Sequence, residues 1–221
     1  MRAETLPNIV INYYQQMLHF CRQMIKEKND TISQDEIKRL STLLYSDSLE
    51  KQMLAVKKLT NQPNDTMLEQ LNRYLKDEKS DPVLKTIIVQ HLTKEKVNAT
   101  LEIQKFSKHM IINPTQIILP EKDPFILNVK KLLSDVIESK NPTLYELSIQ
   151  VLSNLLMVLY PFPLPAYTPE TIAAAIHIES EKSNGFPISI GTIASMYHVE
   201  QKELEACLIE LEKIMDYNQN Q

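Results

Sequence analysis

The stretch NPTLYELSIQVLSNLLMVLYPFPLP, residues 141–165, decides the fold of this chain. Its first part predicts the longest apolar helix in the sequence, over 142–159, because apolar residues occupy nearly every face after Leu147. Three prolines in YPFPLP then end the helix, since proline lacks a backbone N–H and disfavours a helical residue before it. We expect this helix to be central and buried, with Tyr160 and Phe162 packing between two subdomains.

Helix pairs built to one plan recur along the chain. The stretches that begin at Glu36 and at Met67 each contain an amphipathic helix, a polar turn around Ser-Asp and a second helix. The plan returns after Val129 and ends in the apolar helix of residues 142–159. A repeat of about 30 to 40 residues is typical of stacked helix pairs. The periodicity predicts helices over about 8–28, 33–45, 48–60, 65–76 and 82–92.

Two of the second helices begin with proline directly after a polar residue, at Asp81-Pro82 and at Asn141-Pro142. Proline suits the first helical turn because the N–H that it lacks would be unpaired there. This arrangement resembles a HEAT-type repeat over about residues 35–160, and the resemblance implies an α-solenoid. Tetratricopeptide repeats fit less well because their glycine and aromatic positions are missing. An irregular helical bundle is the alternative.

Helical periodicity stops between residues 98 and 120. Alternating apolar residues over 101–103, a polar turn at 107–108 and β-prone runs over 110–112 and 117–119 predict a small inserted β-hairpin. Inserted segments of this kind can carry contacts with partners. The hairpin either contacts a partner or covers the edge of the helical stack.

The sequence changes character after Pro165. Thr168 and Pro169 are expected to cap and start a helix, and two shorter helices should flank a turn at His198 in a helix-turn-helix pattern. Over residues 171–214 this three-helix module resembles the end of a cyclin-type repeat in transcription initiation factor B. The resemblance implies contact with nucleic acid.

The charge of the C-terminal module argues against DNA. Residues 168–221 hold nine acidic and three basic residues, a net charge of −6, whereas the whole chain carries −4. Binding DNA requires lysine and arginine to neutralise phosphates, so we expect the module to be repelled. Residues 1–167 carry the balance of +2, and their basic residues form a candidate partner surface.

Composition excludes several classes of chemistry. Gly185 and Gly191 are the only glycines, which excludes loops that cradle phosphate groups. The five histidines contain no HExxH motif, and His177 lies in an apolar helix where a core role is expected. Cys21 and Cys207 have no partner at Cys-x-x-Cys spacing, so we expect two thiols rather than a disulfide. We expect no enzyme activity, no cofactor and no metal.

These patterns predict an all-α protein: a HEAT-like helical repeat domain over 1–165 with an inserted β-hairpin over about 98–120, and an acidic helix-turn-helix-like module over 166–221. The expected function is that of a non-enzymatic scaffold or adaptor that binds a protein partner. The alternative is a transcription-associated regulator that binds nucleic acid. We find no signal peptide and no membrane span, and expect a cytoplasmic protein. The arrangement also resembles an uncharacterised family of cytoplasmic proteins from Gram-positive bacteria. The candidate partner-binding residues are Lys57, Lys58, Arg73, Lys76, Tyr160, Phe162, Glu200 and Glu203.

Overall fold

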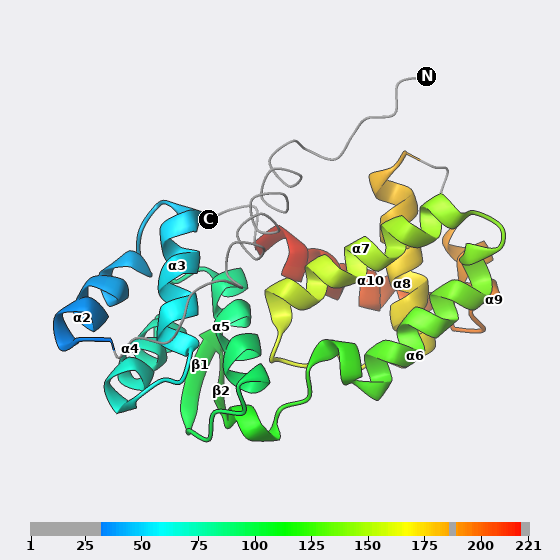
Figure 1. Ribbon diagram of the computed structural model, residues 1–221. Coiled ribbons are helices and arrows are strands. Elements are labelled where there is room, and N and C mark those ends of the chain that lie inside the picture. The colour runs from blue at the N-terminus through cyan, green and yellow to red at the C-terminus, as the bar shows by residue number, and fades with distance from the viewer. Residues whose placement is uncertain (1–31, 186–188, 218–221) are drawn as a thin grey trace. The chain divides into compact units, whose positions relative to one another are not determined.

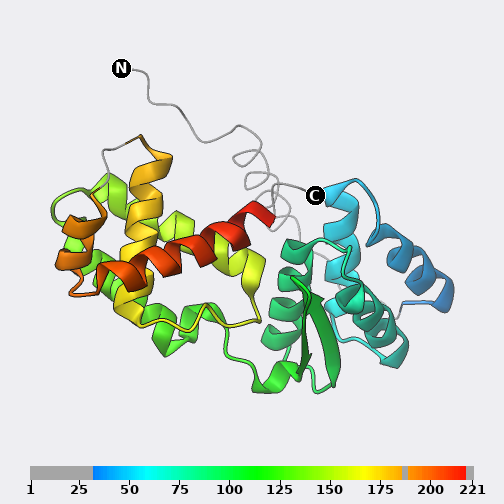
Figure 2. The same ribbon diagram turned by 180° about the vertical axis from the view of Figure 1, so that it is seen from behind.

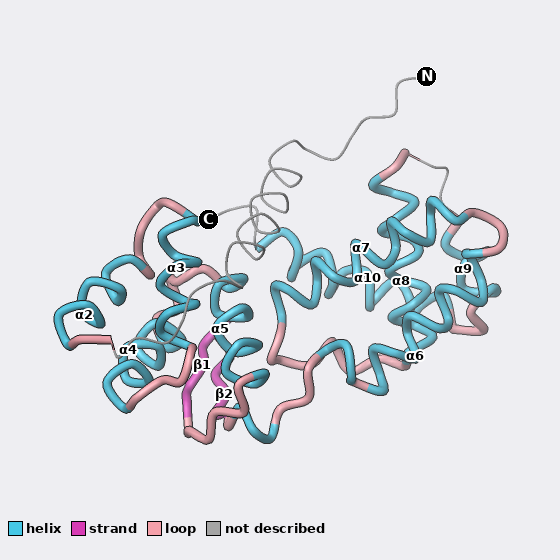
Figure 3. The backbone as a smooth tube through the Cα atoms, viewed as in Figure 1, coloured by secondary structure: helices cyan, strands magenta, loops and turns pink. Residues whose placement is uncertain are grey.

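The computed structural model describes residues 32–185 and 189–217, and the chain divides into two compact units (Figure 1). The first unit ends at Gln116 and the second begins at Ile117. Helices dominate both units, and the described residues also form one two-stranded hairpin (Figure 3), which confirms the predicted helical fold with a small β insertion. The helix predicted over residues 8–28 lies outside the described residues.

The helices of the first unit stack in pairs, as the repeated plan predicts. The first helix of one pair contacts the first helix of the next, and the second helices contact each other likewise. Each helix places fully buried side chains between its neighbours, including Leu40, Val56, Leu71 and Ile88. The four helices are α2 (Gln34–Leu43), α3 (Leu49–Thr60), α4 (Asp65–Lys76) and α5 (Pro82–Lys94).

Local sequence sets where these helices begin. The side chain of Ser33 accepts a hydrogen bond from the Glu36 N–H at the start of α2, and Asn64 accepts from the Met67 N–H at the start of α4. The Asp81 carboxylate accepts from two N–H groups in the first turn of α5, where Pro82 is the first helical residue. Each cap pairs N–H groups that have no partner within the helix.

The hairpin follows α5 and consists of β1 (Leu101–Lys105) and β2 (Lys108–Ile112). The strands are antiparallel, with Leu101 opposite Ile112 and Lys105 opposite Lys108. Two residues form the turn, and both have the positive φ that a tight hairpin turn requires. Residues 117–119, predicted to be β-prone, form no strand.

The second unit is organised around α8 (Pro169–Ser183). Every residue from Thr171 to Ser180 is buried, and α6, α7, α9 and α10 all contact this helix. Alanines at 173–175 have no exposed surface, and their small side chains allow neighbouring helices to approach closely. Figure 2 shows α10 crossing α8. The other helices are α6 (Pro124–Leu133), α7 (Pro142–Leu159), α9 (Ile190–Met196) and α10 (Gln201–Tyr217), with a π-helical turn, η4 (Ser134–Glu138), between α6 and α7.

The apolar helix that the sequence analysis placed at the centre is α7, and it is buried along one face only. Its buried residues are Leu144, Ser148, Leu152, Leu155, Val158 and Leu159, and α8 rather than α7 is enclosed on all sides. By length and composition alone α7 is apolar enough to cross a membrane, which the sequence analysis did not find. In the structure this helix packs against α8, η4 and α10.

The boundary predicted at residue 165 lies inside the second unit. Helices from before and after YPFPLP pack together, because α6 and α7 contact α8. Tyr160 is buried and Phe162 is half-buried, but they do not join two units, since both lie within the second one. The prolines therefore follow the end of α7 within the second compact unit.

A tight turn joins α9 to α10 at the predicted place. His198 has a φ of 57°, and the Val199 N–H donates to the Ala194 carbonyl at 3.0 Å. This backbone pattern ends many helices, usually with glycine at the position with positive φ. A turn thus connects two helices at the predicted place, and both the helix-turn-helix assignment and DNA binding stay predictions.

Candidate functional site

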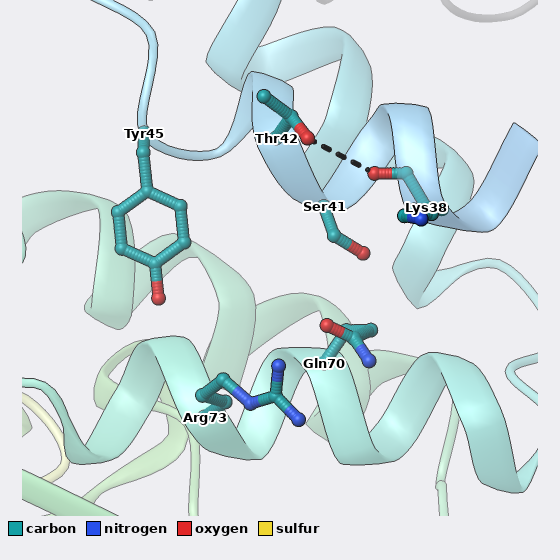
Figure 4. Close-up of a pocket in the computed structure, with 6 residues that line it drawn as sticks. All are labelled: Lys38, Ser41, Thr42, Tyr45, Gln70 and Arg73. Carbon is teal, nitrogen blue, oxygen red and sulfur yellow. Dashed lines mark hydrogen bonds between the residues drawn. The ribbon is translucent and has the colours of Figure 1, made fainter.

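A shallow cavity of about 320 Å³ lies between α2 and α4 in the first unit (Figure 4). Lys38, Ser41 and Thr42 reach it from α2, Tyr45 from the turn that follows, and Gln70 and Arg73 from α4. Residues three, four and seven positions apart lie on one side of a helix. The adjacent side of α2 is apolar, with Ile37 and Leu40 buried in the core. Burial of Ile37 and Leu40 fixes the rotation of α2, and with this rotation the polar row lines the cavity together with Gln70 and Arg73 of α4.

The cavity combines positive charge with hydrogen-bond acceptors. Lys38 and Arg73 line it, and no carboxylate is among its lining residues. The hydroxyls of Ser41 and Thr42 donate to carbonyls of their own helix, at 2.7 and 3.2 Å, so their oxygens keep acceptor capacity for a ligand. Arg73 pairs with Glu69 one turn earlier at 3.3 Å, and both side chains are well exposed. An exposed pair of this kind is weak, so the guanidinium can exchange partners.

Tyr45 supplies an exposed aromatic surface beside the cations. Its side chain is 51% exposed, and its ring lies 5.1 Å from the ring of the buried Tyr74, tilted by 60°. Partial burial and the nearby Asp77 raise the pKa of Tyr45, so its hydroxyl stays protonated at neutral pH and can donate a hydrogen bond. A tyrosine that is apolar on one side and polar at its tip suits a protein interface.

The lining residues do not form a catalytic constellation. None of the six is a histidine, cysteine or carboxylate, the side chains that most often act as general bases in enzymes. Among the described residues, no three metal-binding side chains lie close enough to hold a metal ion. The arrangement can bind a negatively charged or polar group.

The structure distributes the predicted partner-binding residues of the first unit over separate places. Arg73 lines the cavity, whereas Lys76 pairs with Glu102 of β1 at 2.9 Å. Lys58 pairs with Glu36 at the start of α2 at 2.9 Å, and Lys57 is half-buried on α3. Arg73 is thus the one predicted residue that belongs to the cavity.

The other predicted residues belong to the second unit. Tyr160 is buried in its core and Phe162 is half-buried, so neither offers an open binding surface. Glu200 is exposed before α10, and the Glu203 carboxylate accepts a hydrogen bond from Thr171 at 3.3 Å, which ties α10 to α8. A role for these four residues in partner binding stays a prediction.

Lys38, Ser41 and Tyr45 of the cavity were not among the predicted partner-binding residues. Their spacing of three and four positions marks one polar side of an amphipathic helix, but many exposed helix faces share that pattern. What distinguishes this side is the packing of α2 against α4, whose first residues are 31 positions apart. That contact could not be read from the local pattern.

His177 forms a buried polar cluster in the second unit. Its Nδ1 lies 3.3 Å from the Tyr197 hydroxyl and its Nε2 lies 3.4 Å from Glu181 Oε1. Burial, assisted by the charge of Lys140, lowers the pKa of His177 to about 4, and burial raises the pKa of Glu181. The histidine is 4% exposed, which confirms the predicted core role. The cluster ties α8 to α9.

The chain shows similarity to one kind of known protein. No family model matches it, and no solved structure matches it. It is 28% identical over 210 residues to the TPR repeat-containing protein YsoA of Bacillus subtilis (strain 168), across 94% of this chain. The chain spans 63% of the length of that relative. The repeated helix pairs and the similarity to this relative both indicate helical repeats.

The chain is a helical-repeat protein. Stacked pairs in the first unit and a mostly helical second unit support this description. The HEAT-type assignment and the resemblance to transcription initiation factor B have no support among the comparisons. The name of the relative instead contains the repeat class that fitted the sequence less well than the HEAT type.

Proposed function

We propose that this helical-repeat protein binds a segment of a protein partner along α2 and α4. The observation that carries the proposal is the cavity between these two first helices, lined by Lys38, Arg73 and the exposed Tyr45. Stacked helical repeats commonly present a continuous surface made by equivalent helices of successive repeats. The relative is named as a TPR repeat-containing protein, which supports an interaction role without a catalytic one.

The chemistry of the cavity favours an acidic segment. Two cations without a lining carboxylate attract a carboxylate side chain, and arginine binds carboxylates in a two-point geometry. Tyr45 contributes apolar contact area and a hydroxyl donor next to that anchor. The cavity is small enough that it would hold one or two side chains of a longer bound segment. Because the attraction between the cations and the carboxylate is screened by salt, the affinity should fall as the salt concentration rises.

The test is selection of random peptides displayed on phage against the immobilised full-length chain. We expect acidic peptides to be enriched, and a fluorescein-labelled enriched peptide to bind in fluorescence anisotropy. The double variant Lys38→Glu/Arg73→Glu should lose this binding. Lys51→Glu/Lys79→Glu is the matched control, because both lysines are exposed in the same unit and neither lines the cavity.

Two results would contradict the proposal. One is the absence of enriched peptides at low salt. The other is equal loss of binding in the two double variants, because that would mean that net charge rather than the cavity attracts the peptide. Circular dichroism of each variant should show the helix content of the parent, so that a loss of binding can be attributed to the site.

The alternative function, nucleic-acid binding by α9 and α10, rests on the turn at His198. The net charge of −6 over residues 168–221 opposes it, because phosphates need cationic partners. Anisotropy with labelled random duplex DNA at low salt tests this alternative directly. Binding at micromolar protein would support it, and its absence would leave protein binding as the remaining proposal.

A further inference from the structure

The hairpin β1–β2 has two outer edges, and they differ. On the edge of β1, the Glu102 N–H donates to the Asn72 side chain of α4 at 2.7 Å. The Gln104 carbonyl accepts from the ammonium of Lys85 at 2.6 Å, and that ammonium also donates to the Asp77 carbonyl at 2.7 Å. Two outward backbone groups of β1 are thus bonded to side chains of α4 and α5, and α4 packs against this strand. No further strand can pair with that edge.

The same contacts define which groups of β2 point outward. Glu102 lies directly opposite Ile111, and Gln104 lies directly opposite His109. In an antiparallel pair, opposite residues either bond to each other or both turn their N–H and C=O groups away. Since Glu102 and Gln104 bond outward, His109 and Ile111 also direct their backbone groups away from β1.

The edge of β2 is open within the described part of the chain. The backbone N–H and C=O groups of His109 and Ile111 have no hydrogen-bond partner among the described residues. The Ile111 side chain is 65% exposed, more than any other large apolar side chain described. An unpaired edge with an exposed isoleucine is a template for another strand.

We infer that β2 pairs with β2 of a second copy of this chain, antiparallel, with Met110 on the twofold axis. In this register His109 of each copy lies opposite Ile111 of the other, and these two pairs exchange four backbone hydrogen bonds. Lys108 lies opposite Ile112, so no two like charges face each other. Ile111 gains the side chain of His109 of the other copy as its cross-strand neighbour on the same face of the sheet.

The blocked edge of β1 limits this pairing to two copies. The joined hairpins form a four-stranded sheet whose outer strands are both β1, and the side chains of Asn72 and Lys85 close both ends. A twofold contact of one surface with itself is closed and does not propagate into fibres. An acidic or apolar strand from another protein could pair with β2 without this twofold symmetry. The experiment below distinguishes such a partner from a second copy of this chain.

The test is sedimentation equilibrium of the full-length chain at rising micromolar concentrations. We expect a monomer–dimer equilibrium. His109→Pro removes an outward N–H that the hairpin itself does not use, and proline is tolerated on strand edges. Two hydrogen bonds per dimer are lost, so the dimer should dissociate about 30-fold more readily. His109→Ala keeps the N–H and should leave the equilibrium close to that of the parent.

A second measurement locates the axis. Met110→Cys places two thiols directly opposite each other in a pair that lacks mutual backbone bonds, which is close enough for a disulfide. We expect a covalent dimer on a non-reducing gel. Lys108→Cys is the control, because in this register it faces Ile112 rather than its own counterpart.

A monomer at every concentration would overturn the inference. So would a dimer that is equally strong in His109→Pro and in the parent, or cross-linking that is equally fast through positions 108 and 110. A dimer lost equally in His109→Pro and His109→Ala would also contradict it, because the backbone would then not be the contact. Thermal melting of each variant checks that the unit is folded. Peptide binding at the cavity between α2 and α4 is measured separately, so failure of either idea leaves the other standing.

Discussion

Lowering the pH from about 7 to about 5 should destabilise the second unit by about 2 kcal/mol through His177 alone. The histidine has a folded-state pKa of about 4, lowered by burial, against about 6.5 in an unfolded chain. Between these two values the unfolded state binds more protons than the folded state. Stability from this group is therefore present above the unfolded value and is lost as the pH falls toward the folded value.

The magnitude follows from the difference of about 2.5 pKa units, which corresponds to about 3 kcal/mol in full and about 2 kcal/mol by pH 5. The groups that face the ring are Glu181 of α8, Tyr197 after α9 and Lys140 before α7. Glu181 acts in the opposite direction, because its pKa is raised by burial and it takes up a proton early on acidification. A comparison with a variant is needed to isolate the histidine.

The variant is His177→Gln, which stays neutral at every pH and keeps an amide near Tyr197. Urea unfolding followed by far-ultraviolet circular dichroism gives the free energy of unfolding of both chains at several pH values. We expect the advantage of the parent over the variant to shrink by about 2 kcal/mol between about pH 7 and about pH 5. A constant difference between the two chains, or an NMR titration of the ring near its ordinary pKa, would refute the reasoning.

Three further predictions concern other buried or capping groups. Cys207 has no exposed surface, and burial raises the pKa of its thiol to about 12. Iodoacetamide should therefore leave this thiol unmodified in the folded chain and label it in urea, as measured by peptide mass mapping. Labelling without urea would contradict this prediction. Burial lowers the pKa of Lys85 to about 8, so this side chain loses its proton at a lower pH in the folded chain than in the unfolded chain. The free energy of unfolding should therefore rise between about pH 8 and about pH 10, and it should rise more in the parent than in Lys85→Met. Parallel curves for the two chains in urea titrations would count against a buried ammonium. Asn64→Ala should destabilise the first unit by about 1 kcal/mol in thermal melts, because the Met67 N–H loses its acceptor, and an unchanged melting temperature would contradict a capping role.

Elements governed by neighbouring residues could be predicted from the sequence. The cap at Thr168 and the proline starts at Pro82 and Pro142 lie where they were expected, because each depends on bonds within one turn. The hairpin could also be located, since alternating apolar residues interrupt the helical period over a short range. Its second strand begins at Lys108, which the pattern had assigned to the turn.

Features that depend on distant residues could not be predicted. Lys85 stands in an apolar run, and only the carbonyls of Asp77 and Gln104 explain how its ammonium is buried. The domain boundary was placed at YPFPLP because proline ends a helix, but proline says nothing of whether α7 packs against α8. The cavity between α2 and α4 depends in the same way on contact between two repeats, so the counting of exposed charges found Arg73 and missed Lys38.

The scarcity of glycine argues against phosphate-binding loops more strongly than it argues against tetratricopeptide repeats. In a phosphate-binding loop a Cβ would stand where the backbone must approach the ligand, so the lack of glycine excludes the loop. At the end of a helix, a residue other than glycine with positive φ costs only about 1 to 2 kcal/mol. This chain accepts that cost at Lys96 after α5 and at His198 after α9, where the next N–H bonds back to Leu92 and to Ala194 in the same way. Missing glycines are therefore weak evidence against any class of helical repeat, which is why a relative named for TPR repeats is compatible with this sequence.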